Sequence, residues 1–300
     1  MLWVATKRIR RPTQSNSPLR RDDNTRAKSD KEKADLFAEH FHKVFRTNDL
    51  ASTIQSTPLN LEGGNIKHTT PLEVASVIDQ LKICKSPGHD RITPIVLREL
   101  SRKCIVPITN FFNASFHLKH VSSAWKTARM IVILKPGKSP ENPDSYRPIL
   151  LLTILSKVYE KILLSRIRTI INTKNLIPDI QFGFRAKHST TEQVHRIVHE
   201  IAQALENKEF DPAIFLDVSA AFDKVWHLGL LHKIQPHFPP ALCKLILDYL
   251  TSRKFYIQFG EATSDLMPIG AGVPQGSVLG PTLYTLYTMT DRCHHKFICR

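Results

Sequence analysis

Three short polar patterns fix where helices begin in this chain. Ser29, Thr70 and Ser189 are each followed three residues later by a glutamate, which is the arrangement of a capping box. In such a box the hydroxyl accepts a backbone N–H of the first turn, and the glutamate reaches back to the cap. Apolar residues recur at helical spacing after each box. These signals predict helices that begin at residues 29, 70 and 189.

Other segments follow the periods of helices and strands. Helical periodicity extends over residues 94–118, 154–171, 228–235 and 240–251. Strand-like runs occupy residues 128–134, 212–218 and 254–259. Residues 47–68 have the composition of a loop. Because helices dominate the first part and strands mix with helices afterwards, the order predicts an α+β fold.

The chain is strongly basic, with 42 lysines and arginines against 27 acidic residues and a formal net charge of +15. A globular chain with that charge favours a polyanionic partner, and nucleic acid is the first candidate. A basic surface that serves only solubility is the alternative that charge alone leaves open. The longest apolar stretch, residues 149–155, is interrupted by Thr153 and is too short to span a bilayer. We therefore expect no membrane partner.

Asp217 is the residue with the clearest chemical implication. It stands at the end of the apolar run 212–218, where a buried carboxylate is unfavourable unless it binds a metal or accepts hydrogen bonds. Phosphoryl transfer uses carboxylates at strand ends to hold two Mg²⁺ ions. The alternative is that Asp217 caps a helix beginning near Ser219. A single carboxylate does not decide between the two.

Five motifs occur in order along the chain and together resemble one family. They occupy residues 86–90, 135–149, 181–190, 215–227 and 271–281. The fourth reads FLDVSAAFDKVWH and is similar to the first palm motif of reverse transcriptases from jockey-like non-LTR retrotransposons. The fifth, AGVPQGSVLGP, resembles the next palm motif, and the first three resemble amino-terminal and fingers elements. The resemblance implies a right-hand polymerase fold of the α+β class, with a helical fingers region leading into an incomplete palm sheet.

The resemblance implies roles for residues of the first palm motif. Asp217 would hold Mg²⁺ as the catalytic carboxylate of a two-metal site, with the backbone carbonyl of Val218 as a second ligand. Phe222 would be the steric gate that lies under the sugar and disfavours a 2′-hydroxyl. Plain core packing is the alternative role of that ring. Asp223 is expected to support the local helix rather than to bind metal.

The other motifs imply contacts to nucleotide and nucleic acid. Arg147, with Lys135 or Lys138, would clamp the triphosphate of an incoming dNTP, because guanidinium offers paired contacts and ammonium a point charge. Gln275 and Gly276 would lie against the nascent base pair. Contacts to an RNA template paired with a DNA primer are assigned to Gln181, Phe182 and Arg185. The alternatives are a solvated basic loop for the cations and core packing for the phenylalanine rings.

Composition and resemblance together divide the chain. In order, they imply a basic linker expected to be disordered (1–28), a helical segment and loop (29–69), the fingers with the amino-terminal reverse transcriptase region (70–210), a partial palm (211–288) and a divergent tail (289–300). Two positions depart from the family pattern. Leu150 stands where serine is usual and Ala220 where lysine is frequent, and neither change removes an essential group.

The sequence after residue 288 departs from the family. No pair of adjacent aspartates follows Asp217, whereas the family continues to a hairpin that carries such a pair, and then to a thumb. We therefore expect that the chain on its own does not polymerise DNA. Zinc-type ligands occur in the tail, but without the spacing of a zinc finger, at Cys293, His294, His295 and Cys299.

Two other functions stay open beside that of a reverse transcriptase domain. A catalytically dead retroelement remnant would act at most as a nucleic-acid-binding module through its basic surface. A domesticated interaction protein would instead bind a defined protein partner. The family's way of life implies residence in the nucleus, with cytoplasmic complexes of the element's RNA as a second location.

Overall fold

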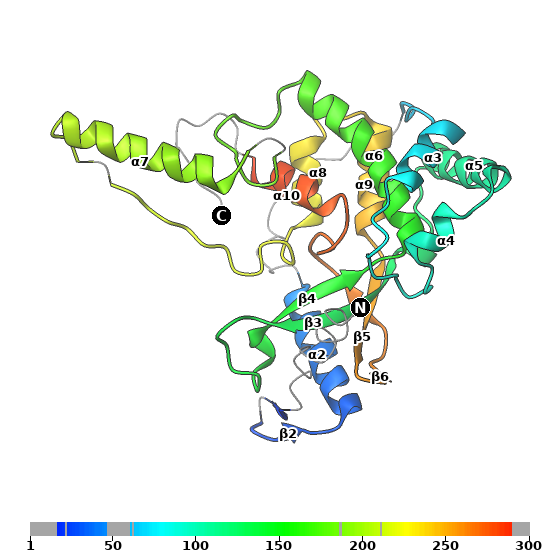
Figure 1. Ribbon diagram of the computed structural model, residues 1–300, viewed down its shortest axis with the longest axis horizontal. Helices are drawn as coiled ribbons and strands as arrows, with labels where there is room; N and C mark the ends of the chain where they lie inside the picture. Colours follow the sequence, from blue (N-terminus) through cyan, green and yellow to red (C-terminus); the bar gives the residue numbers. More distant parts are fainter. Residues whose placement is uncertain are drawn as a thin grey trace, which may run out of the picture.

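The computed structural model describes residues 17–21, 23–46, 61, 63–185, 188–210 and 212–289. A mixed sheet lies beside a larger group of helices (Figure 1). The strands are β1 (Leu19–Arg20), β2 (Arg26–Ala27), β3 (Thr127–Leu134), β4 (Tyr146–Leu151), β5 (Arg253–Phe259), β6 (Ala262–Thr263) and β7 (Met267–Ile269). The helices are α2 (Asp30–Val44), α3 (Pro71–Asp79), α4 (Pro94–Arg98), α5 (Arg102–Leu118), α6 (Ile154–Thr173), α7 (Thr190–Glu206), α8 (His227–Ile234), α9 (Pro240–Leu250) and α10 (Gly280–Thr288), with the short 3-10 turns η2 (Ser123–Trp125) and η3 (Pro143–Ser145). The predicted α+β class is confirmed.

The main sheet joins two distant parts of the chain. Its strand order is β4-β3-β5-β6, and β7 also pairs with β5. β3 and β4 form an antiparallel hairpin, whereas β3 and β5 run parallel. The β4 strand was not predicted, because its six residues include a proline and its pairing depends on β3. The sheet therefore brings the motif at 135–149 close to the chain that leads into the motif at 271–281.

Helix α2 covers one face of this sheet. Its capping box forms as predicted, because the Ser29 hydroxyl accepts from the Glu32 amide and the Glu32 carboxylate accepts from the Ser29 amide. Phenylalanine rings then line the buried side of the helix. Phe37 packs against Phe259, and Phe45 meets Phe255 edge-on with ring centroids 5.5 Å apart. These aromatic contacts make a separate small core between α2 and the sheet.

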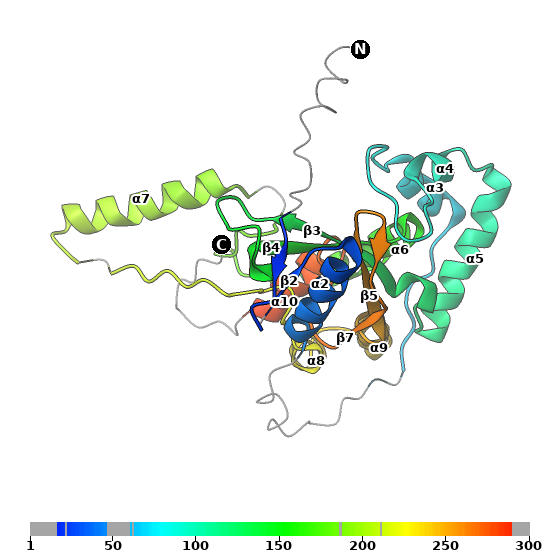
Figure 2. The same cartoon turned by 90° about the horizontal axis from the view of Figure 1, so that it is seen from below.

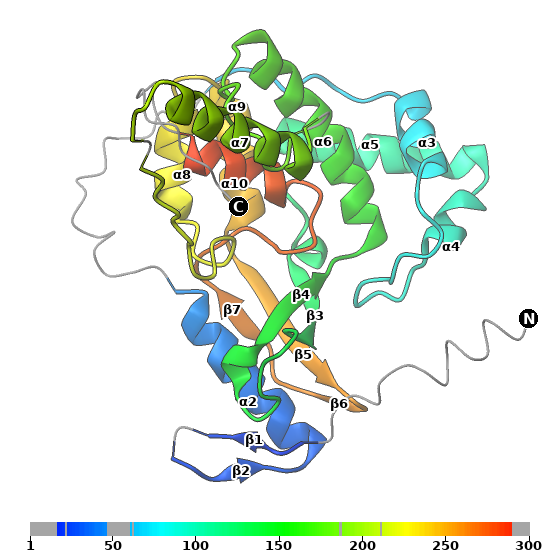
Figure 3. The same cartoon turned by 60° about the vertical axis from the view of Figure 1, so that its left-hand side comes forward.

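The strand pair β1–β2 corrects the prediction that residues 1–28 form a disordered linker. Leu19 pairs with Ala27, and both side chains are buried in the small core under α2. Figure 3 places this pair at the foot of α2. Apolar burial at two positions is enough to fix a segment whose composition reads as polar. The prediction is wrong for these residues, and residues 1–16 lie outside the described part.

The large core lies among α3, α5, α6, α8, α9 and α10. α6 is its central helix and is buried on most of its circumference between Ile154 and Ile171. The predicted helical region 94–118 is two helices, since the chain breaks between α4 and α5. At α3 only half of the predicted capping box forms. Thr70 accepts from the Glu73 amide, but the Glu73 carboxylate pairs with Arg166 of α6 instead.

Helix α7 extends away from the rest of the chain, as Figures 1 and 2 both show. Its capping box at Ser189 and Glu192 forms as predicted. None of its residues is buried, although one side carries a stripe of apolar residues. The exposed members of that stripe are Val194, Val198, Ile201 and Leu205.

The predicted strand at 212–218 is wrong. These residues have no regular secondary structure, and all of them are exposed. An apolar run becomes a strand only where a neighbouring strand pairs with its backbone, and none of the described strands lies beside this segment. No helix in the described part of the chain combines the length and the apolar character that crossing a bilayer requires.

Candidate functional site

The β3–β4 hairpin presents the predicted cations. Arg147 lies opposite Ile133 in the register and is exposed on the strand face that points away from α2. Lys138 lies in the tight turn after β3, where its amide donates to the carbonyl of Lys135 at 3.2 Å. The ammonium group of Lys135 donates to the carbonyl of Asp144 at 2.7 Å. The three cations therefore gather at one end of the hairpin, with Arg147 and Lys138 open to solvent.

The motif at 271–281 packs directly on β4. The amide of Leu150 donates to the carbonyl of Gln275 at 2.9 Å. Gly276 has φ +111°, and a Cβ atom at that position would lie 2.7 Å from the carbonyl oxygen of Leu150. Only glycine fits this approach without displacing the backbone. Gln275 is half-buried, and its side-chain oxygen has no hydrogen-bond partner among the described residues.

The motif at 215–227 meets the same loop. The amide of Val273 donates to the carbonyl of Phe222 at 2.8 Å. The Phe222 ring stacks on Tyr284 of α10 with centroids 4.5 Å apart, and Phe184 meets it edge-on at 5.4 Å. Phe222 also packs against the large core, as the alternative interpretation expected. Its ring is thus held in place between two other aromatic rings.

Two buried titratable side chains support this junction. Asp223 is buried, and burial raises the pKa of its carboxyl to about 6, while Lys135 opposes that rise. One of its carboxylate oxygens has no partner among the described residues. His227 donates from Nε2 to the carbonyl of Gly272 at 2.8 Å, and burial lowers the pKa of its imidazole. A neutral imidazole with its proton on Nε2 satisfies both observations.

Asp217 lies apart from this junction. It is exposed in the irregular segment 212–218, so it does not end a strand. It does not cap a helix either, because residues 219–224 form turns and α8 begins only at His227. The helix-cap interpretation of Asp217 is therefore wrong for this structure, and the strand end on which the metal interpretation rested is absent. The metal role itself stays a prediction. Val218, the predicted second ligand, is 62% exposed.

Comparison with known proteins decides the family. The family model described as reverse transcriptase (RNA-dependent DNA polymerase) matches residues 133–292. That match covers the hairpin cations, the Phe222 junction and the Gln275 loop. The chain belongs to the reverse transcriptase family.

Curated relatives of this reverse transcriptase chain carry matching names. A probable RNA-directed DNA polymerase from transposon X-element of Drosophila melanogaster is 41% identical over 294 residues, covering 96% of this chain and 32% of the relative. The one from transposon BS of the same fly is 37% identical, covering 99% and 33%. The RNA-directed DNA polymerase from mobile element jockey is 37% identical, covering 98% and 33%. The chain spans about a third of the length of these relatives.

The residues predicted to contact the template belong to the motif at 181–190. In the structure their side chains contact residues of their own loop. Arg185 donates to the carbonyl of Pro178 at 2.9 Å and to the carboxylate of Asp179 at 3.0 Å. Phe182 meets the ring of His188 edge-on, and the side-chain Nε2 of Gln181 donates to the carbonyl of Gly183. The loop that holds them reaches the junction through Phe184, which contacts Phe222. The three predicted residues therefore form contacts within or close to their own loop, and the motif reaches the others through Phe184.

Reverse transcriptases use divalent metal ions, and the predicted Mg²⁺ site does not fit this structure. No cluster of three or more histidine, cysteine or acidic side chains able to hold a metal ion occurs among the described residues. Asp217 in particular is exposed on irregular backbone. The zinc-type ligands from Cys293 to Cys299 lie outside the described part.

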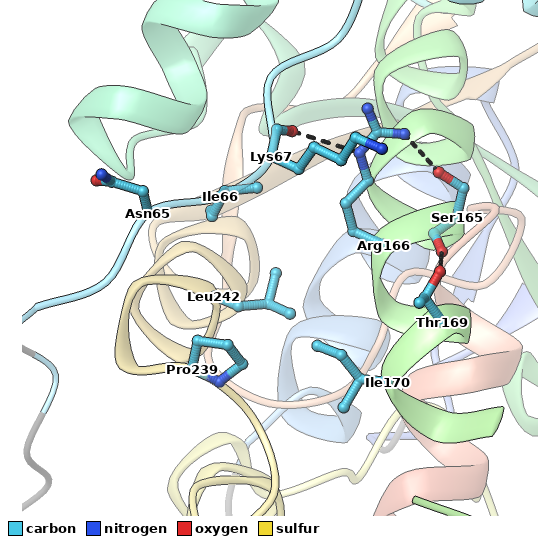
Figure 4. Close-up of a pocket in the computed structure, with 9 residues that line it drawn as sticks. All are labelled: Asn65, Ile66, Lys67, Ser165, Arg166, Thr169, Ile170, Pro239 and Leu242. Carbon is cyan, nitrogen blue, oxygen red and sulfur yellow. Dashed lines mark hydrogen bonds between the residues drawn. The ribbon is translucent and has the colours of Figure 1, made fainter. Parts of the chain in front are cut away.

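A separate pocket of about 400 Å³ lies between α6, α9 and the strap at residues 65–67 (Figure 4). Arg166 closes one side and donates to the carbonyls of Lys67 and His68. Its guanidinium is also paired with Glu73, so it is not available to a ligand. None of the predicted site residues lines the pocket. The pocket is a gap in the packing between residues 65–67 and α6, and it is not part of the predicted site.

Several residues of the site were missed from the sequence. His227 ends the motif at 215–227, where no role was expected for it, and Tyr284 was missed because the helix that carries it, α10, was not predicted. Glu160 could have been singled out from the sequence, because it is an acidic residue among apolar neighbours on the predicted helix. The partners of all three lie far away in the sequence, which is why local patterns did not identify them.

Proposed function

We propose that this chain is the fingers region and first palm segment of a right-hand RNA-directed DNA polymerase. It binds an RNA template paired with a DNA primer, together with the incoming dNTP. The observation that carries the proposal is the junction of three motifs. Leu150 of β4, Phe222 of the first palm motif and the Gln275 loop are joined by backbone hydrogen bonds of 2.8–2.9 Å.

The exposed cations supply the contacts to phosphate. The guanidinium of Arg147 has paired donors suited to a phosphate group, and Lys138 adds a point charge from the neighbouring turn. Both are exposed, so a polyanion reaches them without displacing a protein partner. The formal net charge of +15 supports nucleic acid as that polyanion.

The junction supplies the contacts to base and sugar. Gly276 is exposed beside Gln275 and has no side chain, and the position of its missing Cβ lies against the Leu150 carbonyl oxygen. A base pair stacked there meets backbone rather than a side chain. Phe222, held by Tyr284, offers a rigid ring edge against the sugar of the bound nucleotide. A fixed ring excludes an extra hydroxyl better than a mobile one does.

The 300-residue polypeptide on its own is expected to bind without extending a primer. No cluster of three or more possible metal ligands includes Asp217 among the described residues, and no adjacent aspartate pair follows it in the sequence. Two-metal phosphoryl transfer needs more than one such group. A nucleic-acid-binding module is therefore the second candidate function. We propose that it acts in the nucleus, on the strength of the family resemblance alone.

Primer extension on an RNA template tests this proposal. The polypeptide and its Asp217→Ala variant are incubated with a recessed DNA primer, dNTPs and Mg²⁺. We expect both proteins to shift the duplex in a gel and neither to lengthen the primer. Extension by the wild type that Asp217→Ala abolishes would contradict the binding-only activity. Failure of both proteins to shift the duplex would contradict the proposed function itself.

A further inference from the structure

Glu160 is a fully buried carboxylate in the middle of α6. Its side chain is 1% exposed, and the large core surrounds it. A buried acid is unfavourable unless its oxygens accept hydrogen bonds. One oxygen accepts from the Val278 amide at 2.6 Å and from the Leu279 amide at 3.3 Å. These two amides directly precede α10, so a side chain of α6 provides the acceptor for the start of that helix.

The bonded amides belong to the loop that carries Gln275 and Gly276. A turn closes within this loop, because the Ser277 amide donates to the carbonyl of Pro274 at 3.0 Å. On one side the loop is bound to β4 through Leu150. On the other side it is bound to α6 through Glu160. The loop is therefore held between two fixed elements, and Glu160 makes the second attachment.

The charge around Glu160 is partly compensated. Burial raises the pKa of its carboxyl, and the nearby guanidinium of Arg253 opposes that rise. Arg253 is itself buried and donates to the carbonyls of Tyr249 and Trp125. The hydroxyl of the buried Tyr249 also faces the carboxylate and opposes the rise in its pKa, although the second oxygen of Glu160 accepts no well-formed hydrogen bond among the described residues. The carboxylate therefore has two separable actions: it balances Arg253, and it holds the two amides.

We propose that Glu160 is a positioning residue, whose reach to the Val278 and Leu279 amides holds Gln275 and Gly276 in register with β4. The consequence for affinity rests on the proposed function, because the positioned loop then meets the paired end of primer and template. The length of the Glu160 side chain and its negative charge can be tested separately. Shortening the side chain by one methylene withdraws the acceptor but keeps the charge, whereas the amide isostere keeps the reach and removes the charge.

The matched variants are Glu160→Asp and Glu160→Gln, with Tyr159→Phe as a control. Tyr159 is the adjacent residue on α6, and its hydroxyl hydrogen-bonds Ser115 on the other side of the core. Tyr159→Phe weakens the same helix without touching the loop. Hydrogen exchange of the Val278 and Leu279 amides reports on the loop. Affinity for a recessed RNA–DNA primer–template, measured by fluorescence anisotropy, reports on function.

We expect Glu160→Asp to speed exchange at both amides and to weaken primer–template binding by roughly tenfold. Glu160→Gln keeps the amides protected and the affinity within roughly threefold of wild type. If Glu160→Gln instead weakened binding and sped exchange more than Glu160→Asp does, the proposal would be overturned. Glu160 would then act through its charge on Arg253. Equal loss of affinity in Tyr159→Phe would overturn it too, since general weakening of α6 would suffice. If the wild type binds no primer–template, the proposed function and the affinity effect both fail, and exchange alone decides whether Glu160 holds the loop.

Discussion

The backbone amide of Leu150 donates a hydrogen bond of 2.9 Å to the carbonyl oxygen of Gln275. This bond joins the β3–β4 hairpin to the loop of the motif at 271–281. Because Gly276 follows directly, the same contact brings the chain closer to β4 than any residue with a side chain permits. The candidate site depends on this approach.

Gly276→Ala should therefore destabilise the protein more than an alanine at another left-handed glycine. Its Cβ would lie 2.7 Å from the Leu150 carbonyl oxygen at φ +111°, so we expect a loss of about 3 kcal/mol or more in the free energy of unfolding. Gly137→Ala is the control, because it has φ +72° and nothing within 4 Å of the added carbon. We expect about 1–2 kcal/mol there, from the backbone alone. Equal losses in urea unfolding would show that the approach to Leu150 is not tight.

Asp223 should make stability fall as pH rises. Burial raises the pKa of this carboxyl from 3.8 to about 6, so between these pH values the folded state keeps a proton that the unfolded state has lost. The stabilisation is fully present below about pH 3.8 and is lost as pH rises through about 6. Relative to wild type, Asp223→Asn should gain about 1–3 kcal/mol between pH 4 and 8.

Urea unfolding of both proteins across that pH range checks this prediction for Asp223. Taking the difference between wild type and variant cancels the other titrating groups. Asp265→Asn is a suitable control, because that carboxylate is 94% exposed. A difference that stays constant with pH for Asp223→Asn would mean that the carboxyl is not buried in solution.

The stacked rings of Phe222 and Tyr284 should be energetically coupled. With centroids 4.5 Å apart, a double-mutant cycle of Phe222→Leu and Tyr284→Leu should give a coupling of about 0.5–1.5 kcal/mol. The same cycle between Phe222 and Phe112 serves as the control, since Phe112 contacts other rings of the large core and should show no coupling. If the two cycles give the same value, Tyr284 does not hold the Phe222 ring.

Local signals in the sequence predicted most helices correctly, because capping and periodicity act within one turn. The boxes at Ser29 and Ser189 both form. At Thr70 the box is incomplete, since Glu73 finds a stronger partner in the distant Arg166. The run 212–218 was predicted as a strand and is not one, because strand formation depends on a neighbour that its own residues do not specify.

The sequence named candidate residues of the site but did not predict how their elements are joined in space. The motifs named Arg147, Phe222 and Gln275, which lie in the part of the chain that the family model matches, and the structure joins the elements that carry them. The roles of these three residues stay predictions. Nothing in the sequence around Leu150 or Glu160 indicates that each attaches one side of the Gln275 loop. Those attachments are formed by partners distant in sequence, and only the folded chain brings them together.

The most direct test of the account is binding of a recessed RNA–DNA primer–template by the wild type, Arg147→Ala and Arg102→Ala across a salt series. Both arginines are exposed, but Arg102 begins α5, on the far side of the molecule from the β3–β4 hairpin (Figures 1 and 2). We expect affinity to fall steeply with salt. We expect Arg147→Ala to weaken binding and to reduce the salt slope by about 1, while Arg102→Ala leaves both nearly unchanged. A flat salt response, or equal effects of the two substitutions, would contradict a nucleic-acid site at the hairpin.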